Sequence, residues 1–129
     1  MSKIRVLLAD DHKVILARVR KIIGDEFDIV GEVTNGRDAI VEVGRLNPDV
    51  LVIDISMPVL DGLQAASQLR SKRTKIVFLT VHNDPDFIVA AFSVGASGYV
   101  VKSDLTTDLV PAIREVMDGH TYISQSIPS

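Results

Sequence analysis

The segment DVLVIDISMP, residues 49–58, decides the fold of this 129-residue chain. Its branched apolar run, residues 50–53, shows no polar alternation, which is typical of a strand buried on both faces in the middle of a parallel sheet. Pro58 cannot continue a hydrogen-bonded ladder, so the chain must leave the sheet soon after Asp54. The segment therefore predicts a central parallel strand with one carboxylate, Asp54, at its carboxyl end.

Segments of strand and helix character alternate along the whole chain. Further strands are predicted at residues 4–9, 27–33, 76–79 and 98–101, and apolar residues at helical spacing predict a helix after each strand. The third helix is expected to end among the basic residues Arg70, Lys72 and Arg73, where cations suit the helix dipole. Five strands alternating with five helices predict a doubly wound α/β domain with one parallel sheet.

Glycine and proline predict where several helices begin and end. Gly24 is expected to end the first helix. Asp84 is expected to cap the fourth helix with its side chain, followed by a proline at the first helical position, and Gly95 to end it. Pro111 would lose no hydrogen bond only within the first turn of the last helix, so that helix is expected to begin near Thr107.

Composition excludes several classes of function. The chain has 14 lysines and arginines against 17 aspartates and glutamates, a net charge of −3 that argues against binding nucleic acid by general electrostatics. Because cysteine is absent, disulfides, thiolate metal sites and cysteine nucleophiles are excluded. No signal peptide follows Met1 and no apolar run approaches membrane-spanning length, so we expect a soluble, cytoplasmic protein.

Polar side chains whose chemistry fits together follow four of the predicted strands. They are Asp10 with Asp11, Asp54, Thr80 and Lys102. Each residue alone would more often be a solvated loop residue or a helix cap. Because the carboxyl ends of parallel strands share one edge of a sheet, where ligands bind in such folds, we expect these side chains to form one pocket.

Three carboxylates close together repel one another, and a hard divalent cation such as Mg²⁺ relieves this repulsion. Such a cation would let a phosphoryl group approach Asp54, whose carboxylate can attack phosphorus and form an acyl phosphate. Lys102 would balance the added charge, and the Thr80 hydroxyl could donate a hydrogen bond to a phosphoryl oxygen.

In their order and spacing these features resemble the receiver domain of bacterial two-component response regulators, over nearly the whole chain. The residues that support the resemblance are Asp10-Asp11, residues 52–58 with Asp61-Gly62, Thr80, residues 95–99 and Lys102. The resemblance implies a flavodoxin-like sheet in the order 2-1-3-4-5. It also implies a receiver domain at residues 1–120 and the start of a linker at residues 121–129.

The resemblance implies a role for each matching position in the pocket. Asp54 would be the phosphoacceptor, which receives its phosphoryl group from a sensor histidine kinase. Asp10, Asp11, Asp54 and the backbone carbonyl of Ser56 would hold Mg²⁺. Lys102 would contact the phosphoryl group. The chain would be a signalling switch rather than an enzyme, apart from its own phosphorylation and slow dephosphorylation.

Two residues would convey the phosphorylated state. Thr80 would turn toward the phosphoryl group, and Tyr99 would change its exposure as Thr80 moves. That change would alter the face formed by the fourth helix, the fifth strand and the fifth helix, and homodimerisation is a further expectation. Without the resemblance, Tyr99 would be interpreted as an ordinary strand aromatic.

Two further segments resemble one branch of the family. Residues 10–12, Asp-Asp-His, and residues 119–124 are similar to receivers that precede a LuxR-type helix-turn-helix domain. This implies transcription regulation, with DNA bound through an effector domain absent from these 129 residues, and the chain would be a receiver taken from a transcription factor or a stand-alone relative of such receivers. We expect His12 to lie near a helix start beside the acidic residues rather than to be a metal ligand.

Three positions near the pocket allow finer expectations. Many receivers have a proline after the lysine, in a cis peptide, whereas Ser103 follows Lys102 here. Since a non-proline cis bond costs about 2.5 to 4 kcal/mol, we expect trans geometry or a strained loop. Ser56 and His82, two residues beyond Asp54 and Thr80, would flank the phosphoryl group and tune its hydrolysis.

Two other functions share this type of sheet. A Mg²⁺-dependent phosphohydrolase of the haloacid dehalogenase type also uses a strand-end aspartate, but it would have a second aspartate at the position of Ser56 and a cap domain. A flavin-binding electron carrier would have a phosphate-binding loop after the first strand, where this chain has Asp10-Asp11.

Overall fold

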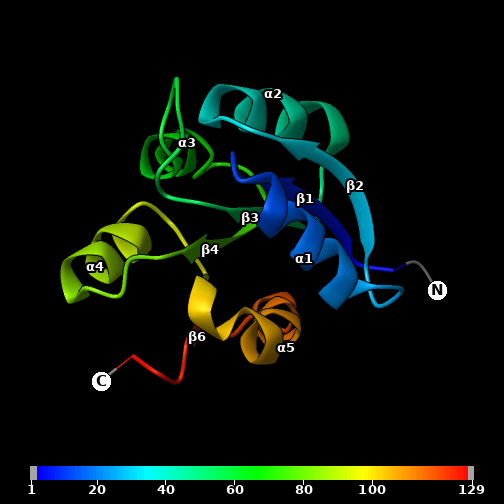
Figure 1. Cartoon of the computed structure of the whole chain (residues 1–129). Helices are drawn as coiled ribbons and strands as arrows, with labels where there is room; N and C mark the ends of the chain where they lie inside the picture. Colours follow the sequence, from blue (N-terminus) through cyan, green and yellow to red (C-terminus); the bar gives the residue numbers. More distant parts are fainter. Residues whose placement is uncertain (1–2, 128–129) are drawn as a thin grey trace.

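The structure, a computed structural model that describes residues 3–127, is organised around one parallel sheet (Figure 1). Its strands are β1 (Arg5–Ala9), β2 (Asp28–Val33), β3 (Val50–Ile53), β4 (Lys75–Thr80), β5 (Gly98–Val101) and β6 (Tyr122–Ile123). They are arranged in the order β2-β1-β3-β4-β5-β6, and every neighbouring pair is parallel. The predicted order 2-1-3-4-5 is therefore confirmed, and β6 is an addition beside β5.

Five α-helices cover the two faces of the sheet (Figure 1). They are α1 (Lys13–Ile23), α2 (Gly36–Leu46), α3 (Gly62–Gln68), α4 (Pro85–Ser93) and α5 (Leu105–Met117). Helices α1 and α5 pack on one face, whereas α2, α3 and α4 pack on the other. Because successive strand side chains point to opposite faces, Val52 belongs to the first core, and Leu51 and Ile53 to the second.

Strand β3 lies inside the sheet, as its unbroken apolar sequence predicts. It pairs with β1 on one side and β4 on the other, so that its last residue, Ile53, lies opposite Ala9 of β1 and Phe78 of β4. Each of its four residues is at most 3% exposed. Strand β3 thus has strands on both sides and helices on both faces, and its carboxyl end positions Asp54.

Several helix ends agree with the sequence. Gly24 ends α1 with a φ of 52°, and Gly95 follows α4 with a φ of 103°, a backbone conformation that glycine adopts without a side-chain clash. Pro85 is the first residue of α4, as predicted. The Asp84 side chain, however, makes no capping hydrogen bond, so the predicted N-cap acceptor is wrong.

Two other helices differ from the prediction. Helix α5 begins at Leu105 rather than near Thr107, and it contains Pro111 in its interior. Proline has no N–H, so Pro111 cannot donate to the Thr107 carbonyl four residues earlier. Both residues are exposed, so water can form that hydrogen bond instead. Helix α3 ends at Gln68, before the basic residues expected in its last turn.

The segment after α5 is partly incorporated in the sheet. Tyr122 and Ile123 pair with Gly98 and Tyr99 of β5, within a region expected to begin a linker. The short 3-10 helix η1 (Lys102–Asp104) joins β5 to α5, and no cis peptide occurs within residues 3–127. The Lys102–Ser103 bond is therefore trans, one of the two expected geometries. Within residues 3–127 no helix has the length and apolarity needed to span a membrane.

Candidate functional site

Four strands end at one edge of the sheet and place there the side chains that the sequence singled out. Asp10 follows β1, Asp54 follows β3, Thr80 is the last residue of β4, and Lys102 follows β5. The Asp54 amide donates to the Ala9 carbonyl at 2.9 Å, which continues the sheet hydrogen bonding to the functional residues themselves. The positions of these side chains are therefore determined by strand pairing.

Lys102 lies between two buried carboxylates. Its Nζ is 2.9 Å from Asp10 Oδ2 and 3.2 Å from Asp54 Oδ2. All three side chains are at most 7% exposed. The Asp10 Oδ2 atom, although close to this ammonium group, accepts no hydrogen bond from any residue in 3–127. One cation thus offsets two buried carboxylates, and their negative charge is only partly compensated.

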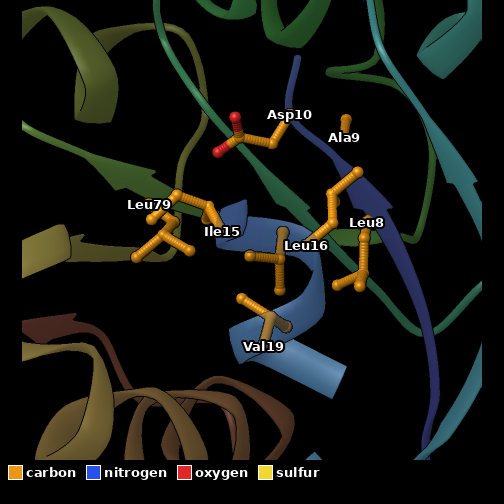
Figure 2. Close-up of a pocket in the computed structure, with 8 residues that line it drawn as sticks. Leu8, Ala9, Asp10, Ile15, Leu16, Val19 and Leu79 are labelled. Atoms are coloured by element: carbon orange, nitrogen blue, oxygen red, sulfur yellow. The ribbon is translucent and has the colours of Figure 1, made fainter. Parts of the chain in front are cut away.

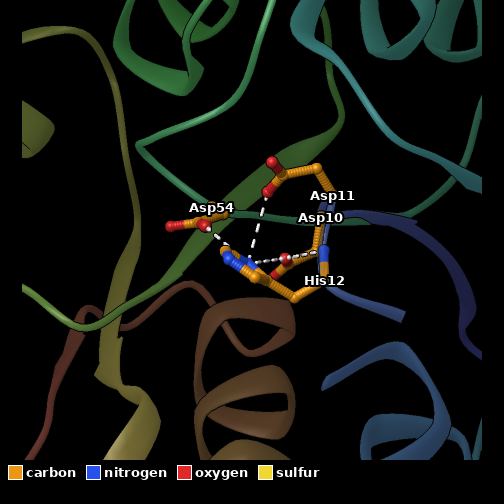
Figure 3. A group of neighbouring side chains, drawn as sticks. All are labelled: Asp10, Asp11, His12 and Asp54. Atoms are coloured by element: carbon orange, nitrogen blue, oxygen red, sulfur yellow. Dashed lines mark hydrogen bonds and ion pairs between the residues drawn. The ribbon is translucent and has the colours of Figure 1, made fainter. Parts of the chain in front are cut away.

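The remaining carboxylate, Asp11, lies on the open side of this group (Figure 3). His12 Nδ1 is 2.9 Å from Asp10 Oδ1, 3.2 Å from Asp11 Oδ1 and 3.9 Å from Asp54 Oδ2. One ligand atom from each of these residues lies within 4.8 Å of the others. His12 is the N-cap residue of α1, so its expected place beside the acidic residues is confirmed.

We name Asp10, Asp11, Asp54 and Lys102 the acidic pocket. Burial raises the pKa of the Asp54 carboxyl, the Lys102 charge opposes this rise, and the Asp10 charge adds to it. The folded structure therefore disfavours the ionised form of Asp54 relative to the protonated form, a condition that we call electrostatic strain. Additional positive charge at the open side would relieve that strain.

Below Asp10 the acidic pocket borders the apolar core between the sheet and helix α1 (Figure 2). A cavity of about 10 Å³ lies there, lined by Ile15, Leu16, Leu79 and other apolar side chains. Such a volume holds at most about one water molecule. The carboxylate of Asp10 is thus solvated poorly from below, and charged partners must come from the pocket side.

His82 connects the end of β4 to Tyr99, a contact that the sequence did not reveal. Thr80 Oγ1 accepts a hydrogen bond from the His82 amide at 3.3 Å, and Tyr99 Oη donates to the His82 carbonyl at 2.7 Å. Tyr99 is fully buried, and burial, with Asp84 and Asp54 nearby, raises its pKa to about 12. Tyr99 and Thr80 are therefore linked through the backbone amide and carbonyl of a single residue, His82.

The His82 side chain lies beside Ser56, its counterpart at the end of β3. Its Nε2 is 3.1 Å from Ser56 Oγ, and its ring stacks on Phe87 at 4.0 Å between centroids. The Ser56 amide is 3.4 Å from Asp54 Oδ1. The two residues expected to flank the phosphoryl group are thus in contact with each other, on the side of Asp54 toward α4.

Backbone packing behind Asp54 explains a glycine in this loop. A Cβ atom on Gly62 would lie 2.0 Å from the Asp54 carbonyl oxygen, and the Gly62 amide donates to the Ile55 carbonyl at 2.7 Å. Nearby, Val59 has a φ of 70°, in a tight turn closed by Leu60 N–H and the Pro58 carbonyl at 2.8 Å. The spacing from Asp54 to Gly62 marks this loop, but only the fold shows the close approach.

Comparison with known proteins agrees with this geometry. Residues 6–114 match the family described as response regulator receiver domain. The transcriptional regulatory protein DegU of Brevibacillus brevis is 32% identical over 98% of this chain, and the chain spans 55% of that relative. The chain thus corresponds to little more than half of such a protein.

Two solved structures are also similar. A LuxR-family two-component response regulator from Aurantimonas sp. SI85-9A1 superposes with a TM-score of 0.92 at 31% identity, covering 98% of this chain and 93% of that one. A structure described as two RcsB dimers bound to two parallel DNAs has a TM-score of 0.87 at 27% identity, covering 98% and 66%. This chain therefore belongs to the response regulator receiver domain family, in its LuxR branch.

Proposed function

We propose that this domain is a phosphorylation-activated switch in which Asp54 is the phosphoacceptor. The observation that supports this most is the buried arrangement of Asp10, Lys102 and Asp54 at the carboxyl edge of the sheet, with Lys102 Nζ 3.2 Å from Asp54 Oδ2. A carboxylate at the edge of the sheet with a fixed cation beside it suits covalent transfer of an anionic group. The proposed phosphodonor is a sensor histidine kinase.

The donor set fits Mg²⁺. Asp10, Asp11 and Asp54 supply carboxylate oxygens from neighbouring positions, and the backbone carbonyl of Ser56 is the further proposed ligand. Hard cations prefer oxygen ligands, and Asp10 Oδ2 is a buried oxygen without a hydrogen bond from the described residues. When bound, Mg²⁺ would supply positive charge that offsets the carboxylates and an incoming phosphoryl group.

The transfer itself needs a nucleophile and charge compensation. An Asp54 carboxylate oxygen forms a bond to phosphorus while the bond from phosphorus to the kinase imidazole nitrogen breaks, and that nitrogen takes up a proton. Lys102 remains within reach of Asp54 and stabilises the added negative charge. Thr80 exchanges its contact with the His82 amide for one with a phosphoryl oxygen.

The same contacts suggest how the phosphorylated state reaches the surface. When Thr80 leaves the His82 amide, the loop that accepts the Tyr99 hydroxyl through the His82 carbonyl is free to shift. Tyr99 then alters the face formed by α4, β5 and α5. To convert an equilibrium from mostly inactive to mostly active, phosphorylation must favour the active state by about 5.5 kcal/mol.

The relatives suggest the output. DegU is named a transcriptional regulatory protein, and RcsB dimers were solved on DNA. We propose that residues 1–120 form the receiver and that residues 121–129 begin a linker to a DNA-binding effector domain. Homodimerisation on phosphorylation is part of the same proposal. The net charge of −3 supports DNA contact through such an effector rather than through this domain.

The experiment incubates the purified chain with acetyl phosphate and Mg²⁺ and measures its mass. We expect one acid-stable, hydroxylamine-labile phosphoryl group, located at Asp54 by peptide mapping. Asp54→Asn should abolish incorporation. Asp28→Asn is the matched control, because Asp28 is exposed at the amino end of β2, on the opposite edge of the sheet. Equal incorporation in Asp54→Asn would refute the assignment.

The same samples test the alternative phosphohydrolase function. A phosphohydrolase would release phosphate over many turnovers from small phosphomonoesters and keep no lasting adduct. The side chain two residues beyond Asp54 is Ser56, a hydroxyl in contact with His82 rather than the carboxylate which that alternative uses as a general acid. We therefore expect a single adduct and no sustained phosphomonoester turnover.

A further inference from the structure

The C-terminal segment of the described chain, residues 122–127, is bound to the strand that contains Tyr99. Ser124 is its most enclosed residue, with 1% exposure. The Ser124 amide donates to the Tyr99 carbonyl at 2.9 Å, and Ser124 Oγ accepts from the Val101 amide at 2.9 Å. One serine thus binds β5 on both sides of Val100.

Each of these two contacts leads back to the carboxyl edge of the sheet. On one side, Tyr99 Oη donates to the His82 carbonyl, and the His82 amide donates to Thr80 Oγ1. On the other side, Val101 directly precedes Lys102, whose Nζ is 3.2 Å from Asp54 Oδ2. The two connections from the ends of β3 and β4 to β5 therefore meet at Ser124.

The segment is also attached to α5. The Gln125 amide donates to Asp108 Oδ2 at 3.3 Å. Asp108 is itself buried, at 6% exposure. The Ser126 hydroxyl donates to Asp104, at the start of α5. Residues 122–127 thus join β5 and α5, two elements of the face formed by α4, β5 and α5 that we propose to change on phosphorylation.

The attachment depends on few contacts, so a small displacement can release it. Strand β6 has only two residues, and it lies at the edge of the sheet. Ile123 is 44% exposed, and Tyr122 and Ile127 are only partly buried against the two cores, so no fully buried apolar side chain holds this segment in place. Segments with few buried contacts open more readily than core strands. The hydrogen bonds of Ser124 are therefore a large share of what fixes this segment.

We propose that Ser124 is a positioning residue that couples phosphorylation of Asp54 to the docking of residues 122–127. The inference rests on the proposed function. Phosphorylation draws Lys102 and Thr80 toward the phosphoryl group, and the displacement reaches β5 at Val101 and at Tyr99. Both hydrogen bonds of Ser124 then weaken together, and the segment detaches from β5 while the rest of the sheet stays intact.

Amide hydrogen exchange of the whole chain tests this coupling. The wild-type protein is compared without and with excess acetyl phosphate and Mg²⁺, and its mass reports the adduct. We expect the amides of Ser124 and Val101 to exchange about tenfold faster when Asp54 is phosphorylated. The amides of Leu7 and Leu8 in β1, far from β6 in the sheet, should keep their exchange rates.

The outcomes separate the two proposals. If the adduct forms on Asp54 while Ser124 and Val101 exchange at their original rates, the coupling is refuted and the phosphoacceptor assignment stands. If no adduct forms on Asp54, the proposed function fails, and the coupling fails with it. The wild-type measurement decides this without any variant.

A variant then distinguishes coupling from a merely structural role. Ser124→Ala removes the acceptor of the Val101 amide, so that amide should exchange rapidly before phosphorylation, and acetyl phosphate should change its rate by less than about twofold. Gln125→Ala is the matched control, because the Gln125 side chain is exposed in the same segment and only its backbone amide contacts Asp108. It should retain the wild-type response to acetyl phosphate. An unchanged response in Ser124→Ala would overturn the role of Ser124.

Discussion

Replacing Lys102 by methionine tests whether this lysine offsets two buried carboxylates. Its Nζ lies 2.9 Å from Asp10 Oδ2 and 3.2 Å from Asp54 Oδ2, with all three side chains at most 7% exposed. Removing one partner of a buried ion pair costs about 3 to 5 kcal/mol, because the other charge is left uncompensated. Since whole domains have about 5 to 15 kcal/mol of stability, Lys102→Met should remove a large part of it.

The assay is urea unfolding at pH 7 without divalent cations. We expect Lys102→Met to lower the free energy of unfolding by about 3 kcal/mol, and Mg²⁺ to restore part of the loss. Lys72→Met is the matched control, since Lys72 is exposed in the loop after α3, and it should change stability by about 0.5 kcal/mol or less.

A double variant shows whether the loss arises from the pocket. In an Asp54→Asn background one of the two carboxylates is neutral, so Lys102→Met should cost clearly less than it does in the wild-type protein. Equal costs in both backgrounds would refute the electrostatic reasoning. A loss below about 1 kcal/mol in the single variant would refute it too, because a surface pair is worth that little.

Three further predictions concern the loop around Asp54. Because burial raises the pKa of Asp54, its ionised form costs stability above the unfolded-state value of about 3.9, so Asp54→Asn should be more stable than wild type at pH 7. In urea unfolding that gain should shrink as the pH falls through the raised pKa and disappear near pH 3.5; a gain independent of pH would contradict it. Gly62→Ala should lower the free energy of unfolding by about 2 kcal/mol or more and slow acetyl phosphate labelling, because the new Cβ would lie 2.0 Å from the Asp54 carbonyl oxygen. Val59→Gly should raise the free energy of unfolding, measured by thermal denaturation, by about 1 kcal/mol, because it relieves a φ of 70°. The control Val41→Gly replaces an exposed valine inside α2, and it should lower the free energy of unfolding.

The acidic pocket could be predicted because strand ends are legible in sequence. An apolar run such as residues 50–53, followed by a proline and flanked by helical patterns, favours a buried parallel strand, and the residue after such a strand lies at the carboxyl edge of the sheet. Asp10, Thr80 and Lys102 follow from the same rule. Helix boundaries were less predictable. Pro111 argued for a late start of α5, but a solvent-exposed carbonyl can tolerate the missing donor, so burial elsewhere on the helix prevailed.

The amino-acid order alone was sufficient for the order of β1 to β5 in the sheet, for the gathering of carboxylates and lysine at one edge, and for the family resemblance. These features depend on local periodicity and on the parallel direction of the strands. The contacts of His82 with Tyr99 and Ser56, the approach of Gly62 to Asp54, and the attachment of Ser124 to β5 depended on the folded chain. Three of these contacts involve a backbone group, and the contact between His82 and Ser56 joins two side chains that are 26 residues apart. Backbone groups are identical at every position, so only the packing of the elements selects the pairs.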